Sequence, residues 1–368
     1  MIKHEFDACL VSASMIGQLR DIKFTKDIIV IAVDDNLDFV PEYNYWSKLP
    51  EPKDFAFFRE LADCNPDKII VLIIPGDHWN SQYFEQHKNI RVINWYPFNE
   101  NDTYATIAPV EKNFNSNVTG ICLSRQMRSH RYALISYLLG KNYDNFFHIS
   151  AMHLYKQLEK IPSNDLLDHL DWQFDPEHDT VKQIMCLGFK KLYSKHTTTN
   201  CFQKPTVEAY PMSANGSTVL KFDNKTNFDN NLRPLYANSF VELVNCRLYS
   251  EPTVSIDEKY INTIYARNFP VFLGSNCSVQ ILRESGLDMF DDIVDHTYDT
   301  IQNPIDRLVS AVESNYHLIS NPEQTKKLWL ENQHRFDKNI EFAKNTLYKY
   351  YDNISMQRWK EIMSDLLH

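Results

Sequence analysis

The sequence predicts an α/β fold with two domains, each built around an open parallel sheet. A chain of 368 residues is long for a single core, and 43% of its residues are apolar, so it can fold as a globular protein. Residues 239–286 have the pattern strand, helix, strand, helix, which is a βαβ crossover unit. The first third of the chain repeats this alternation of short apolar runs and a helix.

In the first third, β-branched apolar runs are bounded by polar or turn-forming residues. Such runs are typical of parallel strands buried on both faces, and we predict three: 28–33, 68–74 and 89–93. Between the first two, residues 54–63 are predicted to be helical because Phe57, Phe58 and Leu61 fall on one side. Together these elements form an N-terminal domain over residues 1–112.

The middle of the chain starts with a polar, irregular stretch, residues 100–117, which we interpret as the interdomain linker. A second sheet is predicted to begin with a strand at 118–123 and to continue with one at 146–149. The helix between them would bury one face, made of Leu134, Ile135, Leu138 and Leu139. Residues 165–229 give a weak signal, and we expect loops there with one or two short helices.

The last third gives clearer signals. Residues 240–244 and 270–274 are predicted strands, and a short helix after the second should end at Gly286. Asn303-Pro304 is a helix start, with asparagine as the N-cap and proline at the first position. Apolar residues at helical spacing continue to the end of the chain. We therefore place a second domain at 113–321 and C-terminal helices at 322–368.

Composition narrows the function classes. The eight glycines form neither GxGxxG nor GxxxxGK[ST], so side chains and helix N-termini would have to hold any phosphate. Seven cysteines without metal-ligand spacing indicate reduced thiols and a cytoplasmic protein. Apolar runs such as Ile28–Val33 are far shorter than the ~20 residues that span a bilayer, and no secretory leader is visible. We therefore predict no membrane span, and no obligate protein partner is visible.

The region 118–318 resembles a known family. The residues that carry the resemblance are Ser239, Phe240, Glu242, Glu258, Lys259, Pro270, Leu273, Gly274, Leu282, Arg283, Gly286, Phe290, Asp292, Asp295, Tyr298 and Asp299. In this order they resemble the donor-binding half of a GT-B glycosyltransferase, especially the exostosin-like group found in phage and giant-virus genomes.

The resemblance implies a GT-B fold: two Rossmann-like domains, with a C-terminal helix packing back on the N-terminal domain. The N-terminal domain would bind the acceptor and the second domain a nucleoside-diphosphate sugar, expected to be UDP-linked. That sugar nucleotide would be a co-substrate, and no permanently bound cofactor is expected. For a viral protein, the compartment would be the cytoplasm of the host cell.

A carboxylate and a cation at one helix start could hold the donor nucleotide. By resemblance, Glu258 would bind the ribose hydroxyls and Lys259 would face the diphosphate, with Ser255 beside them. Ser255-x-x-Glu258 is also a capping box, in which the glutamate bonds back to the serine main chain. Both interpretations remain open at this point.

Three arginines, Arg125, Arg128 and Arg131, follow the first strand of the second sheet. Guanidinium groups grip phosphate in a fork geometry that lysine cannot reproduce. In the resembling enzymes an arginine at this strand-to-helix turn contacts the diphosphate. The alternative is a solvated basic face at a helix start, where the helix dipole would disfavour it.

A general base for the acceptor hydroxyl is needed if the transfer inverts the anomeric configuration. Asp34, Asp77 and His78 are candidates, because they follow predicted strands of the first sheet. The alternative for His78 is a packed loop residue. Asp257-Glu258-Lys259 is not a DxD metal motif, so we predict a metal-independent enzyme with no metal site.

The acceptor is the most open question. Residues 181–233 hold 8 basic and 3 acidic residues, including Lys190, Lys191 and Lys195, interleaved with aromatics, as in nucleic-acid surfaces. A hydroxymethylated pyrimidine in phage DNA is therefore one candidate acceptor. A solvated loop has the same composition, and the first 117 residues are acidic, with 18 Asp and Glu against 11 Lys and Arg. The alternatives are a glycan or small-molecule acceptor, a nucleotide-sugar epimerase or hydrolase, and a non-catalytic interaction protein.

Overall fold

The computed structural model describes part of the chain in two compact units. The first unit comprises residues 1–99, 251–256 and 348–368, and the second comprises 100–250 and 257–347. The described residues are 6–11, 19, 22–33, 53–75, 84–95, 107–124, 129–151, 176–198, 228, 232–246, 249 and 258–367. Within these ranges, no helix has the length and apolar character needed to cross a membrane.

The first unit contains a parallel sheet with the strand order β1-β2-β3-β4. Its strands are β1 (Phe6–Val11), β2 (Ile28–Val33), β3 (Ile69–Pro75) and β4 (Ile90–Trp95). The three predicted strands are confirmed, and β1 was not predicted, because Asp7 interrupts its apolar run. The Asp7 carboxylate accepts hydrogen bonds from the main-chain nitrogens of Thr25 and Lys26, at 2.6 and 2.9 Å.

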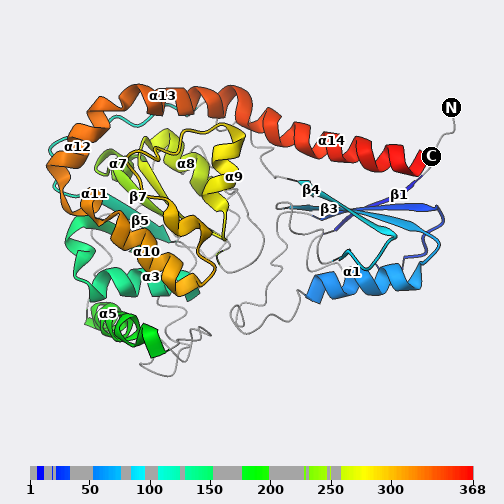
Figure 1. Ribbon diagram of the computed structural model, residues 1–368, viewed down its shortest axis with the longest axis horizontal. Coiled ribbons are helices and arrows are strands. Elements are labelled where there is room, and N and C mark those ends of the chain that lie inside the picture. The colour runs from blue at the N-terminus through cyan, green and yellow to red at the C-terminus, as the bar shows by residue number, and fades with distance from the viewer. Residues whose placement is uncertain are drawn as a thin grey trace, which may run out of the picture. The chain divides into compact units, whose positions relative to one another are not determined.

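Each face of this sheet is covered by a different helix (Figure 1). Because consecutive right-handed crossovers keep connecting helices on one face, a sheet in this order needs a cover from elsewhere on the other. Helix α1 (Lys53–Cys64) buries Phe58 and its neighbours against one set of alternate strand residues. Helix α14 (Tyr348–Leu367) places Trp359 and Ile362 against the opposite set, which includes Val30 and Val71. The C-terminal helix thus packs on the N-terminal sheet.

The second unit contains a parallel sheet with the strand order β6-β5-β7-β8. Its strands are β5 (Gly120–Ser124), β6 (Phe147–Ala151), β7 (Val241–Asn245) and β8 (Phe269–Leu273). Helix α3 (Ser129–Gly140) connects β5 to β6, and α8 (Glu258–Ala266) connects β7 to β8. The chain first moves to one side of β5 and later adds strands on the other side, so the strand order reverses between β5 and β7. The two connecting helices accordingly lie on opposite faces of the sheet (Figure 1).

Further helices in the described part of the second unit surround this sheet. They are α5 (Asp179–Thr198), α7 (Arg233–Ala237), α9 (Ser278–Ser285), α10 (Pro304–Ser314), α11 (Tyr316–Ser320), α12 (Pro322–Glu331) and α13 (Gln333–Phe342), followed by a π-helical turn, Ala343–Leu347. The predicted cap is confirmed: the Asn303 side chain accepts from the main-chain nitrogens of Ile305 and Asp306. The helix ends at Ser314, and Asn315 separates it from α11.

Helix α5 corrects the prediction for residues 165–229. It has twenty residues where we expected loops and short helices, and it buries Met185, Phe189 and Leu192. Two glycines, Gly140 on α3 and Gly188 on α5, let the two helices approach unusually closely. A Cβ atom added to Gly188 would lie 1.7 Å from the carbonyl oxygen of Ser136, a distance that no side chain permits.

Gly188→Ala should therefore lower the free energy of unfolding by about 2 kcal/mol, since the added methyl group must push two packed helices apart. At an exposed helical position the same change would stabilise the helix by about 1 kcal/mol. The sign of the change in free energy of unfolding, measured by chemical denaturation, therefore distinguishes a closely packed Gly188 from an exposed one. Leu187→Ala is the control, because Leu187 is 51% exposed and should change stability little. A Gly188→Ala protein as stable as the wild type would contradict the close contact.

Candidate functional site

In open parallel sheets, ligands bind outside the carboxyl ends of the strands, at the point where the strand order reverses. In the second unit this point lies beyond Ser124 and Asn245, the last residues of β5 and β7. The Asn245 amide nitrogen donates to the Ser124 hydroxyl at 3.0 Å and contacts the sulfur of Cys122 at 3.2 Å. Each of these side chains is at most 1% exposed. A buried polar bridge therefore joins the two strands where a ligand is expected.

The first turn of α3 places Arg131 and His130 at the same point. Arg131 Nη2 donates to the carbonyl oxygens of Asn245 and Cys246, at 3.3 and 3.2 Å. His130 Nε2 lies 3.1 Å from the oxygen of Cys246, and both side chains are 3% exposed. Arg131 thus brings a buried positive charge to the carboxyl end of β7. Its predicted contact with a diphosphate remains a prediction.

A second buried guanidinium group, that of Arg307 on α10, holds the segment that follows β7. It lies 4.6 Å from the ring centre of Tyr249 and donates to the oxygens of Tyr249 and Ile301. The Tyr249 hydroxyl donates to the main-chain oxygen of Pro304 at 2.7 Å. The His130 ring stacks on Tyr249 with ring centres 5.2 Å apart. Sequence reasoning missed Arg307, since it followed the cap and the apolar positions of that helix.

Helix α8 is described from Glu258 onward, so the Glu258-Lys259 pair lies in its first described turn. Lys259 is partly exposed, and its main-chain oxygen accepts from the hydroxyl of Thr263 at 2.8 Å. Burial raises the pKa of Glu242 on β7, and the positive charge of Lys259 opposes that shift. The side chain of Glu258 lies outside the described residues, so the choice between ribose ligand and capping box stays open.

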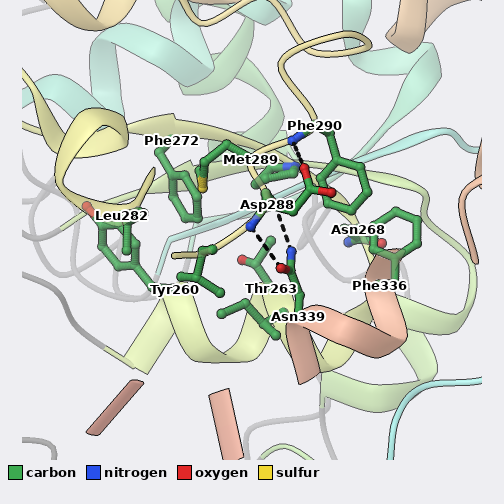
Figure 2. Close-up of a pocket in the computed structure, with 13 residues that line it drawn as sticks. Tyr260, Thr263, Asn268, Phe272, Leu282, Asp288, Met289, Phe290, Phe336 and Asn339 are labelled. Carbon is green, nitrogen blue, oxygen red and sulfur yellow. Dashed lines mark hydrogen bonds between the residues drawn. The ribbon is translucent and has the colours of Figure 1, made fainter. Parts of the chain in front are cut away.

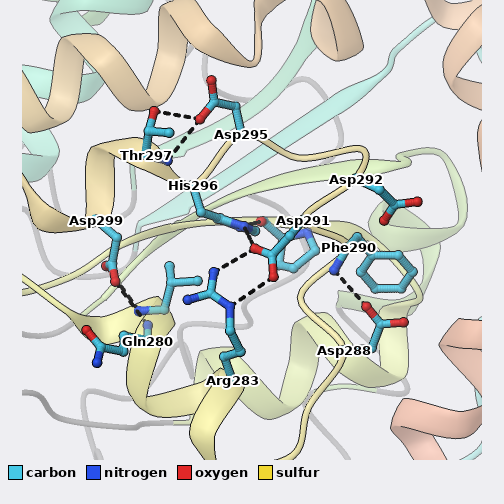
Figure 3. A network of polar contacts seen from close by, with 12 residues as sticks. Gln280, Arg283, Asp288, Phe290, Asp291, Asp292, Asp295, His296, Thr297 and Asp299 are labelled. Atoms are coloured by element: carbon cyan, nitrogen blue, oxygen red, sulfur yellow. Dashed lines mark hydrogen bonds and ion pairs between the residues drawn. The ribbon is translucent and has the colours of Figure 1, made fainter.

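The N-terminus of α9 is already occupied by a carboxylate of the protein (Figure 3). Both oxygens of Asp299 accept main-chain hydrogen bonds, from Val279 and Gln280, each at 3.0 Å. Burial raises the pKa of Asp299, and these two hydrogen bonds oppose the shift. Because Asp299 already takes the anion position of this helix, we do not place a phosphate there.

The neighbouring aspartates Asp292 and Asp295 also make structural contacts (Figure 3). Asp295 accepts from the main chain and hydroxyl of Thr297, and Asp292 pairs with Arg335 at 2.9 Å. An open hollow of about 690 Å³ lies over this segment. Its charged lining is engaged too: Asp291 binds Arg283 through two hydrogen bonds, which lower the pKa of the carboxyl group.

A second cavity, between α8, β8 and α13, is too small for a substrate (Figure 2). Its volume is about 20 Å³, which is room for one water molecule. Phe272, Phe290 and Phe336 form much of its wall, and Asn339 closes one side through hydrogen bonds with Asp288. We interpret it as a packing void.

A buried ionisable pair lies towards the amino end of β7. Glu242, 3% exposed, accepts from the hydroxyls of Tyr236 and Thr263 at 3.0 and 2.7 Å. The Lys112 ammonium donates to the carbonyl oxygens of Tyr236 and Ser239 and to the side chain of Asn268. Burial raises the pKa of Glu242 to about 7 and lowers that of Lys112. The pair is remote from the strand carboxyl ends, and we assign it to structure.

The contacts of residues 107–117 correct the predicted position of the interdomain linker. Residues 107–117 were expected to be part of it, but they pack on the second unit. The main-chain nitrogen of Val110 donates to Tyr265, and that of Asn113 donates to Ala237. Arg233 holds the carbonyl oxygens of Ala108 and Pro109. The start of the second unit is therefore anchored before its first strand.

The three lysines proposed to contact nucleic acid lie on α5. Lys191 donates to the carbonyl oxygen of Leu139 at 2.9 Å and to the Asn142 side chain at 2.5 Å, so it caps the end of α3. Lys190 is exposed, and the side chain of Lys195 lies outside the described residues. These contacts give Lys191 a structural role.

Several predicted site residues lie outside the part of the chain that the structure describes: Asp34, Asp77, His78, Arg125, Arg128 and Ser255. Within the described part, no group of three His, Cys, Asp or Glu side chains is arranged to hold a metal ion. Burial raises the pKa of Cys122 to about 12, so this thiol at the switch point is a poor nucleophile at neutral pH.

The described site thus combines a reversal of strand order, a buried polar bridge and a buried arginine. Comparisons of the chain with protein-family models, curated proteins and solved structures find no significant match.

Proposed function

We propose that this protein is a nucleotide-sugar-dependent glycosyltransferase of the GT-B type. The observation that carries the proposal is the reversal of strand order between β5 and β7 in a parallel sheet, with Arg131 buried at that point. Helix α8 supports it, because Glu258 and Lys259 stand at its start, on the connection that leaves the carboxyl end of β7. Such a point suits a phosphorylated nucleotide.

The chemistry follows from the charges. In the transfer, the bond between the sugar C1 and the diphosphate oxygen breaks, and the diphosphate leaves with the electron pair. The acceptor hydroxyl oxygen bonds to C1, and a base takes its proton. Arg131 and the N-terminus of α3 would favour the charge that builds on the diphosphate, with Lys259 as a further cation. Asp34, Asp77 and His78 stay our candidates for the base.

We restrict the proposal to an acceptor hydroxyl, without assigning its class. A hydroxymethylated pyrimidine in DNA has weaker support than the donor site. Lys191 caps a helix instead of standing free on the surface, and the first third of the sequence is acidic. An epimerase or hydrolase would share the donor half, and it would consume the sugar nucleotide without any acceptor.

Thermal unfolding with a panel of nucleoside diphosphates tests the donor site. A ligand at one hundred times its Kd should stabilise the folded protein by about 2.7 kcal/mol and raise Tm. We expect one nucleotide to raise Tm of the wild type. In Glu258→Ala most or all of that rise in Tm should be lost. Glu341→Ala removes an exposed glutamate of α13 and should keep the shift. If no nucleotide at millimolar concentration raises Tm of the wild type, the proposal fails.

A further inference from the structure

Asn245 has hydrogen-bonding capacity that the protein does not use. Its side chain is 1% exposed, and its amide nitrogen bridges to β5. Its Oδ1 atom is buried without a hydrogen-bond partner. Exchanging the two amide atoms would leave the nitrogen at that position instead, so one heteroatom stays unsatisfied in either orientation.

Ser275 shows the same feature after the neighbouring strand. It is 2% exposed, and its hydroxyl has no partner. Asn245 pairs with Leu273 in the sheet, so Ser275 follows β8 at the same edge. A Cβ atom added to Gly274 would lie 3.1 Å from the hydroxyl of Tyr260, which places this turn against the first turn of α8.

Asn276 extends the set. Its amide nitrogen is buried without a partner, while its amide oxygen accepts from the sulfur of Cys277 at 3.0 Å. A buried polar atom without a hydrogen bond is costly, and native proteins retain few of them without a reason. Here three such atoms, one on Asn245 and one each on the adjacent residues Ser275 and Asn276, stand just beyond or at the carboxyl ends of two adjacent strands, beside the proposed donor site. A bound ligand would satisfy all of them.

The chemistry of these groups indicates what they bind. Amides and hydroxyls are neutral, and together they can both donate and accept, as a sugar hydroxyl does. A phosphoryl group only accepts, and it is better matched by cations. We propose that Asn245, Ser275 and Asn276 form a neutral subsite for sugar hydroxyl groups of the donor. The inference rests on the proposed function, and the hydroxyls belong either to the ribose or to the transferred sugar.

Calorimetric binding on Asn245→Ala and Ser275→Ala tests this subsite. The probes are uridine and guanosine diphosphate, their 2′-deoxy forms and their glucose conjugates. Matched controls are Asn315→Ala and Ser285→Ala: both side chains are buried, and both have partners, Asp295 and Leu282 respectively. These controls should lose stability but keep the wild-type Kd values.

We expect each test variant to weaken binding about tenfold, the value of one lost hydrogen bond to the ligand. If the loss disappears with the 2′-deoxy probe, the subsite holds the ribose; if it is confined to the glucose conjugates, it holds the transferred sugar. Wild-type Kd values in both test variants would overturn the subsite and leave the proposed function intact. A wild type that binds none of the probes would overturn both.

Discussion

Replacing Lys112 by methionine should lower the free energy of unfolding by about 4 kcal/mol at pH 8, because buried oxygen atoms lose their donor and a buried carboxylate loses a nearby cation. Three oxygen atoms, from Tyr236, Ser239 and Asn268, lose the donor they share. Glu242 also loses a cation that lowers its pKa. Methionine fills a similar volume, so little of the loss should come from a cavity.

Chemical denaturation measures this loss, with Lys338→Met as the control. Lys338 is exposed on α13, so its replacement should change stability by less than about 0.5 kcal/mol. The double variant Lys112→Met/Glu242→Gln should regain part of the loss, because removing both charges relieves the unpaired carboxylate. A Lys112→Met protein within 1 kcal/mol of the wild type would refute the contribution of this pair.

The sequence predicted those elements whose signal is local. Ile28–Val33 is apolar throughout, because strands covered on both faces need no polar side, and it became β2. The N-cap of α10 could be predicted because Asn303, Pro304 and their contacts lie within four residues of one another. Strand β1 was missed because its one charged residue, Asp7, is satisfied by main-chain groups 18 and 19 positions away.

Helix α5 shows a signal that was present but outweighed. Met185, Phe189 and Leu192 recur at helical spacing, which alone favours an amphipathic helix. The lysines among them suggested a solvated loop. In the structure Gly188 is what lets α5 approach α3, a contact between helices that helical spacing alone does not predict.

In the candidate site, too, features with a local sequence signal were predicted and those that depend on long-range contacts were not. The start of α8 at Glu258 was predictable from local pattern and resemblance. The bridge from Asn245 to Ser124 spans 121 positions, and the contact from Lys112 to Asn268 spans 156. No periodicity or spacing rule links such residues, since their proximity results from the strand order of the sheet. The resemblance named Glu242 as a matching position, but not its burial or its partners.

The stability of the protein should fall as pH rises from about 4.5 to 7, through Glu242. The pKa of this carboxyl group rises from its ordinary value of 4.5 to about 7 in the folded protein, because burial disfavours the charged form. Below pH 4.5 the carboxyl group is protonated in both states. Between these values the unfolded chain releases the proton and the folded protein keeps it, so the free energy of unfolding decreases with pH. The full loss is about 3 kcal/mol, and it is complete above pH 7.

Comparing wild type with Glu242→Gln across pH 4 to 8 isolates this contribution from the other titrating groups. Glutamine keeps an oxygen for the hydroxyls of Tyr236 and Thr263 but does not titrate. The difference in free energy of unfolding should therefore shift in favour of the variant as pH rises, by up to about 3 kcal/mol. The charges of Lys112 and Lys259 oppose the rise in the pKa of Glu242, so Lys112→Met should raise that pKa further and extend the decline to higher pH at the same limiting slope. A difference that stays constant from pH 4 to 8 would mean that Glu242 titrates normally in the folded protein.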